Sequence, residues 1–512
     1  MDQHNKSISS IAAKVREYHR QNTPFRIYHG STNSTRHVSF AQGGVIDTSN
    51  LCHVLEVNRE ARTVLAEPNV PMDQLVNATL PHGLVPPVIM EFPGITVGGG
   101  FAGTAGESSS FEHGFFDRTV NWIEVVTADG EVVTASSSQE GEHGNVDLFH
   151  GAAGSLGTLG VITLLEIRLV DATDLVELTY HPISSVGEAI EKIQEETEGE
   201  KSRSNHYVDG IMFGLNHGVI ITGRRTDTPR QDLQTQRFSR ARDPWFYLHA
   251  RKTLSQNPST PTTELTPLTD YLFRYDRGAF WAGAYSFPYF LTPFNRITRF
   301  LLDKLMHTRV LYHAMHESGL ASEFIIQDLR TPCHNAKEFI EFIDEKFGIY
   351  PLWLCPIRNQ EGALMHPHVA GSSNTEKVNE KEDAMLLNVG VWGPYEFPRT
   401  PSTSTRREQF ISANCSLERK LHGLGGMKWL YAQTYYTEEE FWQIYDRQEY
   451  DALRKKYGAV SLPSVFEKAV SGSAGGREES GWGWGLWERW PFAGIKGVVK
   501  TIVRTDYLRG RQ

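Results

Sequence analysis

A glycine-rich segment, residues 95–114, carries the clearest chemical signal in the sequence. It contains six glycines and five hydroxyl side chains, and its centre is Gly98-Gly99-Gly100-Phe101-Ala102-Gly103. Because glycine has no Cβ, the backbone can come close to a ligand, and successive N–H groups can converge on anionic oxygens. The hydroxyls of Thr104, Ser108 and Ser109 add further donors. The segment therefore predicts a loop that holds a diphosphate.

Neither of the two commonest phosphate-binding signatures explains this segment. Gly98–Gly103 matches G-x-G-x-x-G by letter, but it lacks the Lys-Ser/Thr pair of a P-loop. The prolines and glycine of Pro86-Pro87 and Pro93-Gly94 precede it, where a dinucleotide fold needs a buried strand. The sequence thus disfavours a doubly wound dinucleotide-binding fold.

The elements around the segment indicate how it is positioned. Two β-branched runs within Trp122–Thr134 are joined by Asp129-Gly130, which predicts a β-hairpin. A second glycine-rich segment, Asp147–Ile162, leads into an apolar strand that ends at Val170. Upstream, the patterns predict strands and one helix: strands in Arg26–Ser34, Val54–Asn58 and Thr63–Pro68, and a helix in Pro71–Leu80. Two glycine segments therefore bracket one hairpin.

In this order, the motifs resemble the FAD-binding domain of the vanillyl-alcohol-oxidase (PCMH-type) flavoproteins. The motifs that carry the resemblance are Ile95-Thr-Val-Gly-Gly, Glu107-Ser-Ser-Ser with His113-Gly114, Ala128-Asp-Gly-Glu, and Asp147-Leu-Phe followed by Gly154-Ser-Leu-Gly-Thr-Leu-Gly160. The resemblance implies an α+β fold, with a two-part PCMH-type FAD-binding domain and an α/β substrate (cap) domain.

Rarer motifs in the second half narrow the resemblance. From about Arg26 to about Lys468 the sequence is similar to the Δ24-sterol reductase family, the Diminuto or seladin type. The motifs are His206-Tyr-Val-Asp-Gly, Pro244-Trp-Phe, Tyr350-Pro-Leu-Trp-Leu-Cys-Pro356, Leu430-Tyr-Ala and Glu438-Glu-Glu-Phe-Trp442. This implies an FAD-dependent enzyme that reduces a C=C bond in the side chain of a sterol or sterol-like lipid, with NADPH as the electron donor.

The resemblance also implies which residues hold the cofactor. They are Thr96, Val97, Gly98, Gly99, Gly100, Phe101, Ala102, Gly103, Thr104, Ala105, Gly106, Glu107, Ser108, Ser109, His113, Gly154, Gly157, Gly160 and Val161. Some relatives attach FAD covalently through a histidine near the first glycine turn. Here His29-Gly30 lacks a Gly-Gly-His pattern, so non-covalent FAD is expected. No metal site is expected.

Since a flavin itself accepts and donates hydride, the protein must supply a proton donor. Tyr435 and His422 are the candidates, in a segment whose pattern predicts a glycine turn followed by a strand. On such a strand Tyr431 and Tyr435 would share one face and Tyr436 the other. A phenol facing the flavin could act as general acid. The alternative is that these aromatic residues, like Trp353, Trp392 and Trp442, only fill the core.

Two other functions remain open. The same fold could serve an oxidase or dehydrogenase of an alcohol, a sugar lactone or a secondary metabolite. The protein could also be a flavin-binding scaffold without turnover. Measuring NADPH consumption and H₂O₂ production distinguishes the reductase from the oxidase. Reduction of the flavin by NADPH tests the scaffold hypothesis.

Composition limits the classes of partner and the compartment. The net charge of −10 over 512 residues argues against a nucleic-acid binder. The four cysteines have no C-x-x-C spacing, and no run of about 18 apolar residues suggests a membrane span. Residues 1–10 lack the apolar stretch of a signal peptide, although the family typically begins with a membrane anchor. The expected location is intracellular, cytoplasmic or peripheral to the endoplasmic reticulum membrane.

The expected domains are 1–170 for FAD, 171–468 for substrate with a C-terminal helix returning to the flavin domain, and a tail, 469–512. The tail places four tryptophans in Gly481–Phe492, and Lys496, Lys500 and Arg504 follow at helical spacing. Aromatic and cationic side chains suit a bilayer surface, so peripheral membrane contact is one interpretation. The other is that the tail folds back on the protein or forms an oligomer contact.

Overall fold

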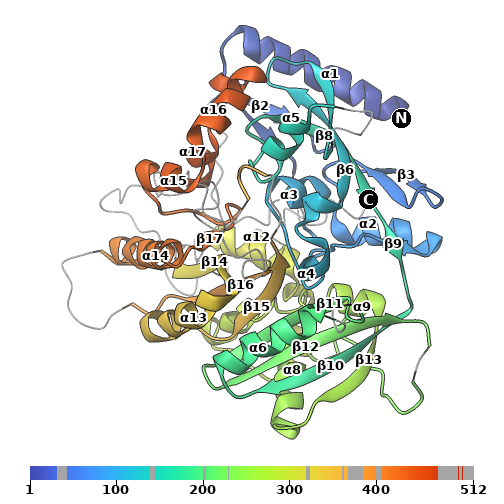
Figure 1. The fold of residues 1–512 in the computed structure, drawn as a ribbon, viewed down its shortest axis with the longest axis vertical. Helices are drawn as coiled ribbons and strands as arrows, with labels where there is room; N and C mark the ends of the chain where they lie inside the picture. The colour runs from blue at the N-terminus through green and yellow to red at the C-terminus, as the bar shows by residue number, and fades with distance from the viewer. Residues whose placement is uncertain are drawn as a thin grey trace.

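The computed structural model describes residues 1–30, 43–138, 144–199, 203–228, 230–318, 323–359, 363–366, 385–397, 405–470, 494 and 499. Helices and strands are both abundant, which confirms the α+β class (Figure 1). Most of the predicted tail, 469–512, lies outside the described residues after Val470. Of the described helices, none combines the length and apolar character needed to span a bilayer.

The first large sheet is five-stranded and contains the predicted hairpin. Its strands, in spatial order, are β3 (Val54–Asn58), β4 (Thr63–Ala66), β8 (Gly160–Arg168), β6 (Val120–Thr127) and β7 (Val132–Ser136). The turn between β6 and β7 has Gly130 at φ +89°, a conformation that glycine adopts readily. The hairpin and the helix predicted at 71–80, which is α2 (Met72–Thr79), are confirmed.

Two short strand pairs and three short helices complete this part of the protein. They are β1 (Phe25–Tyr28) paired with β2 (Gly44–Asp47), β5 (Leu84–Val85) paired with β9 (Val170–Asp171), and α3 (Val97–Ala102), α4 (Ser110–His113) and α5 (Val146–Ala152).

The second large sheet has eight strands, and every pair of neighbouring strands in it is antiparallel. Its order is β13 (Thr262–Pro267), β10 (Leu175–Ile183), β12 (His217–Thr226), β11 (Tyr207–Gly214), β15 (Leu352–Arg358), β16 (Met385–Pro394), β14 (Phe324–Pro332) and β17 (Met427–Lys428). In Figure 1 it occupies the lower half of the molecule, below the five-stranded sheet.

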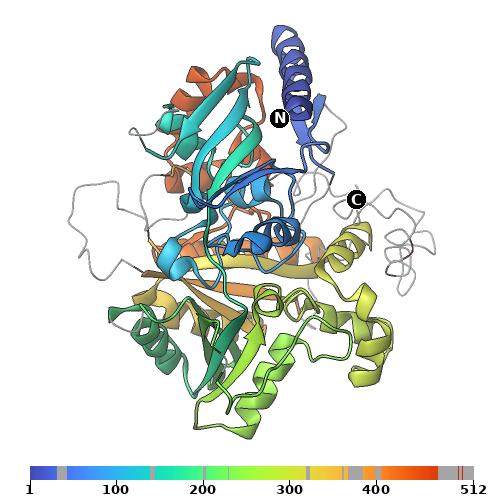
Figure 2. The same ribbon diagram turned by 90° about the vertical axis from the view of Figure 1, so that its right-hand side faces the viewer.

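Helices cover this second sheet. They are α6 (Val186–Thr197), α8 (Phe246–Gln256), α9 (Leu268–Leu272), α13 (Cys333–Phe347) and α14 (Arg406–Gly423). A further helix, α12 (Thr308–Ser318), precedes β14 in the sequence. The helical spacing of Phe339, Ile340 and Ile343 predicted α13, and all three side chains are fully buried. Two short helices, α10 (Ser286–Tyr289) and α11 (Arg296–Leu301), precede α12 and lie at the lower right of Figure 2, in yellow-green.

The last helices return to the first sheet. They are α15 (Glu438–Ile444), α16 (Arg447–Lys456) and α17 (Val465–Val470), and Figure 1 shows α16 beside α5. The Tyr450 hydroxyl bonds Thr158 Oγ1 at 2.8 Å, and Lys468 Nζ donates to the carbonyls of Leu156 and Gly157. The C-terminal helices therefore pack on the second glycine segment.

Two predictions about local structure are wrong. Residues 97–102 form the short helix α3 instead of an open loop, with the Thr96 side chain accepting a hydrogen bond from Gly99 N at its N-cap. The tyrosines at 431 and 435 do not share a strand, because β17 pairs with β14 only over Met427–Lys428. Beyond Lys428 the backbone has no strand partner among the described residues and follows an irregular path to α15.

The N-terminal helix α1 (Asp2–Arg20) is held against the first sheet by both apolar and ionic contacts. Its buried residues Ile8, Ile11 and Val15 recur at helical spacing. The buried His4 ring lies between two carboxylates, with Nδ1 2.8 Å from Glu67 Oε1 and Nε2 3.2 Å from Glu124 Oε1. Hydrogen bonds to Glu124 and Glu67 raise the pKa of His4 to about 9.

This histidine predicts that the protein loses stability in mildly alkaline solution. A histidine with pKa 6.5 when unfolded and about 9 when folded stabilises the fold fully below pH 6.5, and the contribution disappears as pH rises through 9. The loss stays below ~3.5 kcal/mol, since one pKa unit corresponds to ~1.4 kcal/mol and solvent screening lowers the contribution. Urea unfolding at both ends of this range should show it, and His4→Gln should flatten the dependence. An equal slope in the variant would contradict the assignment.

Candidate active site

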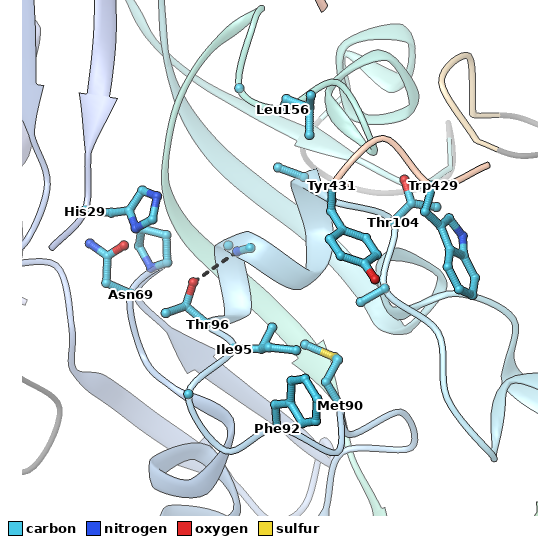
Figure 3. A pocket seen from close by; sticks show the side chains of 18 of the residues that line it. His29, Asn69, Met90, Phe92, Ile95, Thr96, Thr104, Leu156, Trp429 and Tyr431 are labelled. Atoms are coloured by element: carbon cyan, nitrogen blue, oxygen red, sulfur yellow. Dashed lines mark hydrogen bonds between the residues drawn. The ribbon is translucent and has the colours of Figure 1, made fainter. Parts of the chain in front are cut away.

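A cavity of about 310 Å³ lies between the two glycine segments and the second sheet (Figure 3). One wall consists of residues from the first part of the sequence, including residues 94–96, 98–99, 102–106, 156–157 and 160. The facing wall comes from the second part and is mainly aromatic. Its members are Phe280, Tyr312, Asp328, Trp353, Trp392, Trp429 and Tyr431. Lys468 lines the cavity on the side of the second glycine segment, since its Nζ donates to the carbonyls of Leu156 and Gly157. The fold thus brings the predicted diphosphate segment opposite a set of aromatic and ionisable side chains.

The glycines of α3 have different structural roles. A Cβ on Gly98 would lie 2.7 Å from Pro68 Cβ, and one on Gly100 would lie 2.4 Å from Met90 Cε, so these two allow close packing. Gly99 is exposed and lines the cavity, and a Cβ there would meet only Thr96 Oγ1, at 3.1 Å. Gly103 lies next to the opposite wall, where its Cβ would be 3.8 Å from Tyr431 Cβ. Gly99 is therefore the glycine whose missing side chain leaves room in the cavity.

The donors in this wall suit the diphosphate of FAD. The backbone N–H groups of Thr104, Gly106 and Gly157 make no hydrogen bond within the described part of the protein, and all three residues line the cavity. Orphan amides at an irregular, glycine-rich turn are the donors that bind phosphate oxygens. Arg26 and Lys468 bring positive charge to the same cavity. The residues present therefore fit an anionic dinucleotide.

The predicted cofactor residues divide into two groups. Those that line the cavity are Thr96, Gly98, Gly99, Ala102, Gly103, Thr104, Ala105, Gly106, Gly157 and Gly160. The described lining does not include Val97, Gly100, Phe101, Glu107, Ser108, Ser109, His113, Gly154 or Val161. His29, the histidine considered for covalent attachment, lies near the N-terminal end of α3 together with Asn69, whereas Tyr431 and Trp429 lie near its other end (Figure 3).

The Glu107-Ser108-Ser109 motif forms a buried structural network. The Glu107 carboxylate accepts hydrogen bonds from the backbone N–H and side-chain hydroxyl of both Ser108 and Ser109, at 2.5–2.9 Å. Ser108 Oγ also accepts from Arg274, whose guanidinium pairs with the buried carboxylate of Asp209 at 2.8 Å. This network joins the two parts of the protein beneath the cavity. Burial raises the pKa of Glu107.

Asp328 and Tyr431 form the one carboxyl–phenol pair among the described lining residues. The Tyr431 hydroxyl donates to Asp328 Oδ2, and Asn388 Nδ2 donates to Asp328 Oδ1 at 2.9 Å. Burial raises the pKa of Asp328 to about 6, so its protonated form is accessible near neutral pH. Burial, followed by the charge of Asp328, raises the pKa of Tyr431, so the phenol keeps its proton. The pair can therefore store and pass on protons at the cavity wall.

Glu91 is a second carboxyl in the cavity wall. It is buried, and its Oε1 has no hydrogen-bond partner in the described structure. Burial, reinforced by the charge of Glu107, raises its pKa well above the usual range. Such a shift favours the uncharged form, which can donate a proton. Glu91, Asp328, Arg26 and Lys468 were not selected from the sequence.

The structure places the predicted proton donors away from this cavity. The Tyr435 ring packs against Phe410, its backbone N–H donates to Glu418, and burial raises its pKa. His422 lies in the last turn of α14, with Nδ1 buried and unpartnered among the described residues. Neither belongs to the described lining, whereas Tyr431 from the same segment does.

A second cavity of about 370 Å³ adjoins the first, and the side chains of Phe92, Tyr312 and Trp392 line both. Its described lining comes mostly from residues 279–326 and contains no charged residue. Trp353 and Trp392 therefore do line cavities, whereas Trp442 packs between Phe441 and Tyr450 on the C-terminal helices. A charged and aromatic chamber thus adjoins an apolar one.

Comparison with known proteins agrees with this geometry. A family described as an FAD binding domain matches residues 5–136. The Delta(24)-sterol reductase of Homo sapiens is 30% identical over 433 residues, which cover 82% of this protein and 76% of that one. The enzyme of the same name from Rattus norvegicus is 28% identical, covering 91% and 86%, and that from Arabidopsis thaliana is 28% identical, covering 83% and 76%.

Proposed function

The protein belongs to the Delta(24)-sterol reductase family and is an FAD-dependent oxidoreductase, and we propose that it reduces a C=C bond in the side chain of a sterol or sterol-like lipid with electrons from NADPH. One observation carries the proposal: a proton-holding pair, Asp328 and Tyr431, lines the same cavity as the glycine-rich wall, and this cavity adjoins the apolar second cavity.

The cofactor is held by the protein's own backbone in this proposal. The N–H groups of Thr104, Gly106 and Gly157 take the diphosphate oxygens, with Arg26 and Lys468 balancing the charge. FAD binding is non-covalent in this proposal, because His29-Gly30 lacks a Gly-Gly-His pattern. When bound, the flavin supplies hydride to the alkene. In this proposal residues 1–170 hold FAD and residues 171–468 hold substrate, with the C-terminal helices returning to the flavin side, as the contact between Tyr450 and Thr158 supports.

The second cavity provides the substrate site. A wall without charged side chains among its described residues favours an apolar ring system, because each buried methylene is stabilised by about 0.8 kcal/mol. Phe92, Tyr312 and Trp392 line both cavities, and in this proposal the flexible side chain of the substrate extends past them into the first cavity. The alkene then lies in the first cavity, next to the aromatic wall that includes Tyr431. This arrangement excludes water from the reacting carbons.

The proton comes from the Asp328–Tyr431 pair. The phenol O–H bond breaks as the proton moves to the alkene carbon that does not receive hydride, and protonated Asp328 returns a proton to Tyr431 Oη. A carboxyl with pKa about 6 can do this near neutral pH and is then reprotonated from solvent. Asn388 holds the carboxyl in place.

The test is incubation of the purified holoprotein with NADPH and a sterol that has a Δ24 side-chain double bond. We expect the flavin to bleach under anaerobic conditions and mass spectrometry to show a product heavier by two hydrogens. Bleaching without sterol reduction would contradict the substrate assignment. Production of H₂O₂ from an alcohol, without use of NADPH, would favour the oxidase. A flavin that is never reduced would favour a scaffold.

A further inference from the structure

An apolar patch on the surface lies in the segment around α11. The patch consists of Leu291, Phe294, Ile297, Phe300 and Leu301, whose exposed fractions are between 37% and 76%. Only four other large apolar residues of the described structure are as exposed, and they lie in other segments. Single exposed apolar residues are ordinary, but a cluster of five within eleven residues marks an interaction site.

Helix α11 presents its apolar side outward. Ile297, Phe300 and Leu301 stand at i, i+3 and i+4, the spacing that normally faces a core. Polar bonds hold the helix instead of apolar burial: Asn295 Oδ1 accepts from the N–H groups of Ile297 and Thr298, and Thr298 Oγ1 accepts from Asn295 N. The patch is therefore a fixed feature of the surface.

Basic side chains surround the patch. Arg296 and Lys304 are exposed, and the Arg299 guanidinium lies 4.8 Å from the Phe294 ring centroid. The neighbouring acid, Asp303, is already paired with the buried Arg277 at 2.8 Å. An apolar centre with a cationic rim matches the acyl and phosphate layers of an anionic bilayer.

The patch also adjoins the apolar second cavity. Phe290 and Thr292 line that cavity on one side of the patch in sequence, and Leu302 and Leu305 line it on the other. Val499, which is exposed, lines it as well. The segment that forms the surface patch thus forms part of the cavity wall.

We propose that the 291–301 patch docks the protein on an anionic phospholipid bilayer, with the apolar side chains inserted among the acyl chains and Arg296, Arg299 and Lys304 on the lipid phosphates. The inference does not depend on the sterol assignment, because it concerns binding to lipid and not turnover. The partner of the patch is a bilayer surface and not a second copy of this protein, because two copies would bring one cationic rim against another.

The experiment is co-sedimentation of the full-length holoprotein with phosphatidylcholine vesicles, with and without phosphatidylserine. We expect phosphatidylserine to strengthen the binding, and Ile297→Glu/Leu301→Glu should weaken binding by about tenfold or more. The matched control is Val132→Glu/Val460→Glu, at exposed apolar residues of other elements, which should bind as the unmodified protein does. Flavin absorbance and circular dichroism verify that each variant is folded.

Two further variants test the contributions of the basic side chains and of residues 471–512 to vesicle binding. Arg296→Glu/Lys304→Glu should reduce only the component of binding that phosphatidylserine adds. A protein lacking residues 471–512 should still bind through the patch. Equal binding of the Ile297→Glu/Leu301→Glu variant and its control would overturn the proposal, as would complete loss of binding in the truncated protein. The proposal would also be overturned if Ile297→Glu/Leu301→Glu dissociated a dimer in sedimentation equilibrium and left vesicle binding unchanged.

Discussion

Gly99→Val is expected to abolish stable FAD binding while the protein stays folded. The isopropyl group would occupy the cavity beside the diphosphate wall, where the missing Cβ now leaves room, and the only neighbour of its Cβ is Thr96 Oγ1. We expect FAD affinity to fall by at least about a hundredfold, since losing close backbone approach to a dianion costs several kcal/mol. Flavin absorbance per mole of purified protein, before and after added FAD, measures it.

The matched control is Gly214→Val, where a Cβ would meet no atom within 4 Å. That variant should keep its full complement of FAD. Gly98→Val is a poorer test, because its clash with Pro68 would destabilise the packing of α3 whether or not FAD binds there. Full FAD content in folded Gly99→Val would show that the cavity wall is not the cofactor site.

Tyr431→Phe is expected to lower turnover by roughly 10²-fold or more, the lower range for general acid catalysis, without loss of FAD. The substitution removes only the hydroxyl that donates to Asp328. Tyr435→Phe is the matched control, because Tyr435 lies outside the described cavity lining. The sequence-based assignment predicts the opposite order, so the two variants decide between the assignments in single-turnover reaction of prereduced enzyme with sterol.

The pH profile provides a second readout of the same pair. Since Asp328 must be protonated to return a proton to Tyr431, the rate should fall as pH rises through about 6. Asp328→Asn should be slower and should lack this descending limb. If Glu91→Gln abolishes turnover and both Asp328 and Tyr431 variants keep it, the proton comes from Glu91 instead.

Local signals predicted much of the fold. The Asp129-Gly130 turn requires a left-handed residue, and the apolar spacing of α13 permits only one buried face, so both elements follow from a few neighbouring residues. Helix α1 was missed, although Ile8, Ile11 and Val15 have the same spacing. The pairing of β17 could not be predicted, because it depends on β14, about 100 residues earlier in the sequence.

The candidate site, too, has features that local sequence predicts and features that depend on residues far apart in the sequence. Glycine-rich composition located one wall, but it could not separate Gly99, which faces the cavity, from Gly98 and Gly100, which face Pro68 and Met90. The sequence suggested the serine hydroxyls of the Glu107 motif as cofactor ligands. It could not reveal that Arg274, 166 residues away, donates a hydrogen bond to the hydroxyl of Ser108. Asp328 is an acid inside a buried strand, and only the tertiary structure shows that Tyr431 and Asn388 share it.

The contacts of the final helices have a consequence for biosynthesis. Lys468 Nζ holds the carbonyls of Leu156 and Gly157, at sequence separations of 312 and 311 residues. While the ribosome is still translating the second sheet, the nascent first domain therefore lacks one part of its cofactor wall. Loop closure over such a distance comes late in folding. FAD should accordingly be captured only after almost all of the described residues have emerged, and a chain that ends before α17 should bind FAD more weakly than the full-length protein.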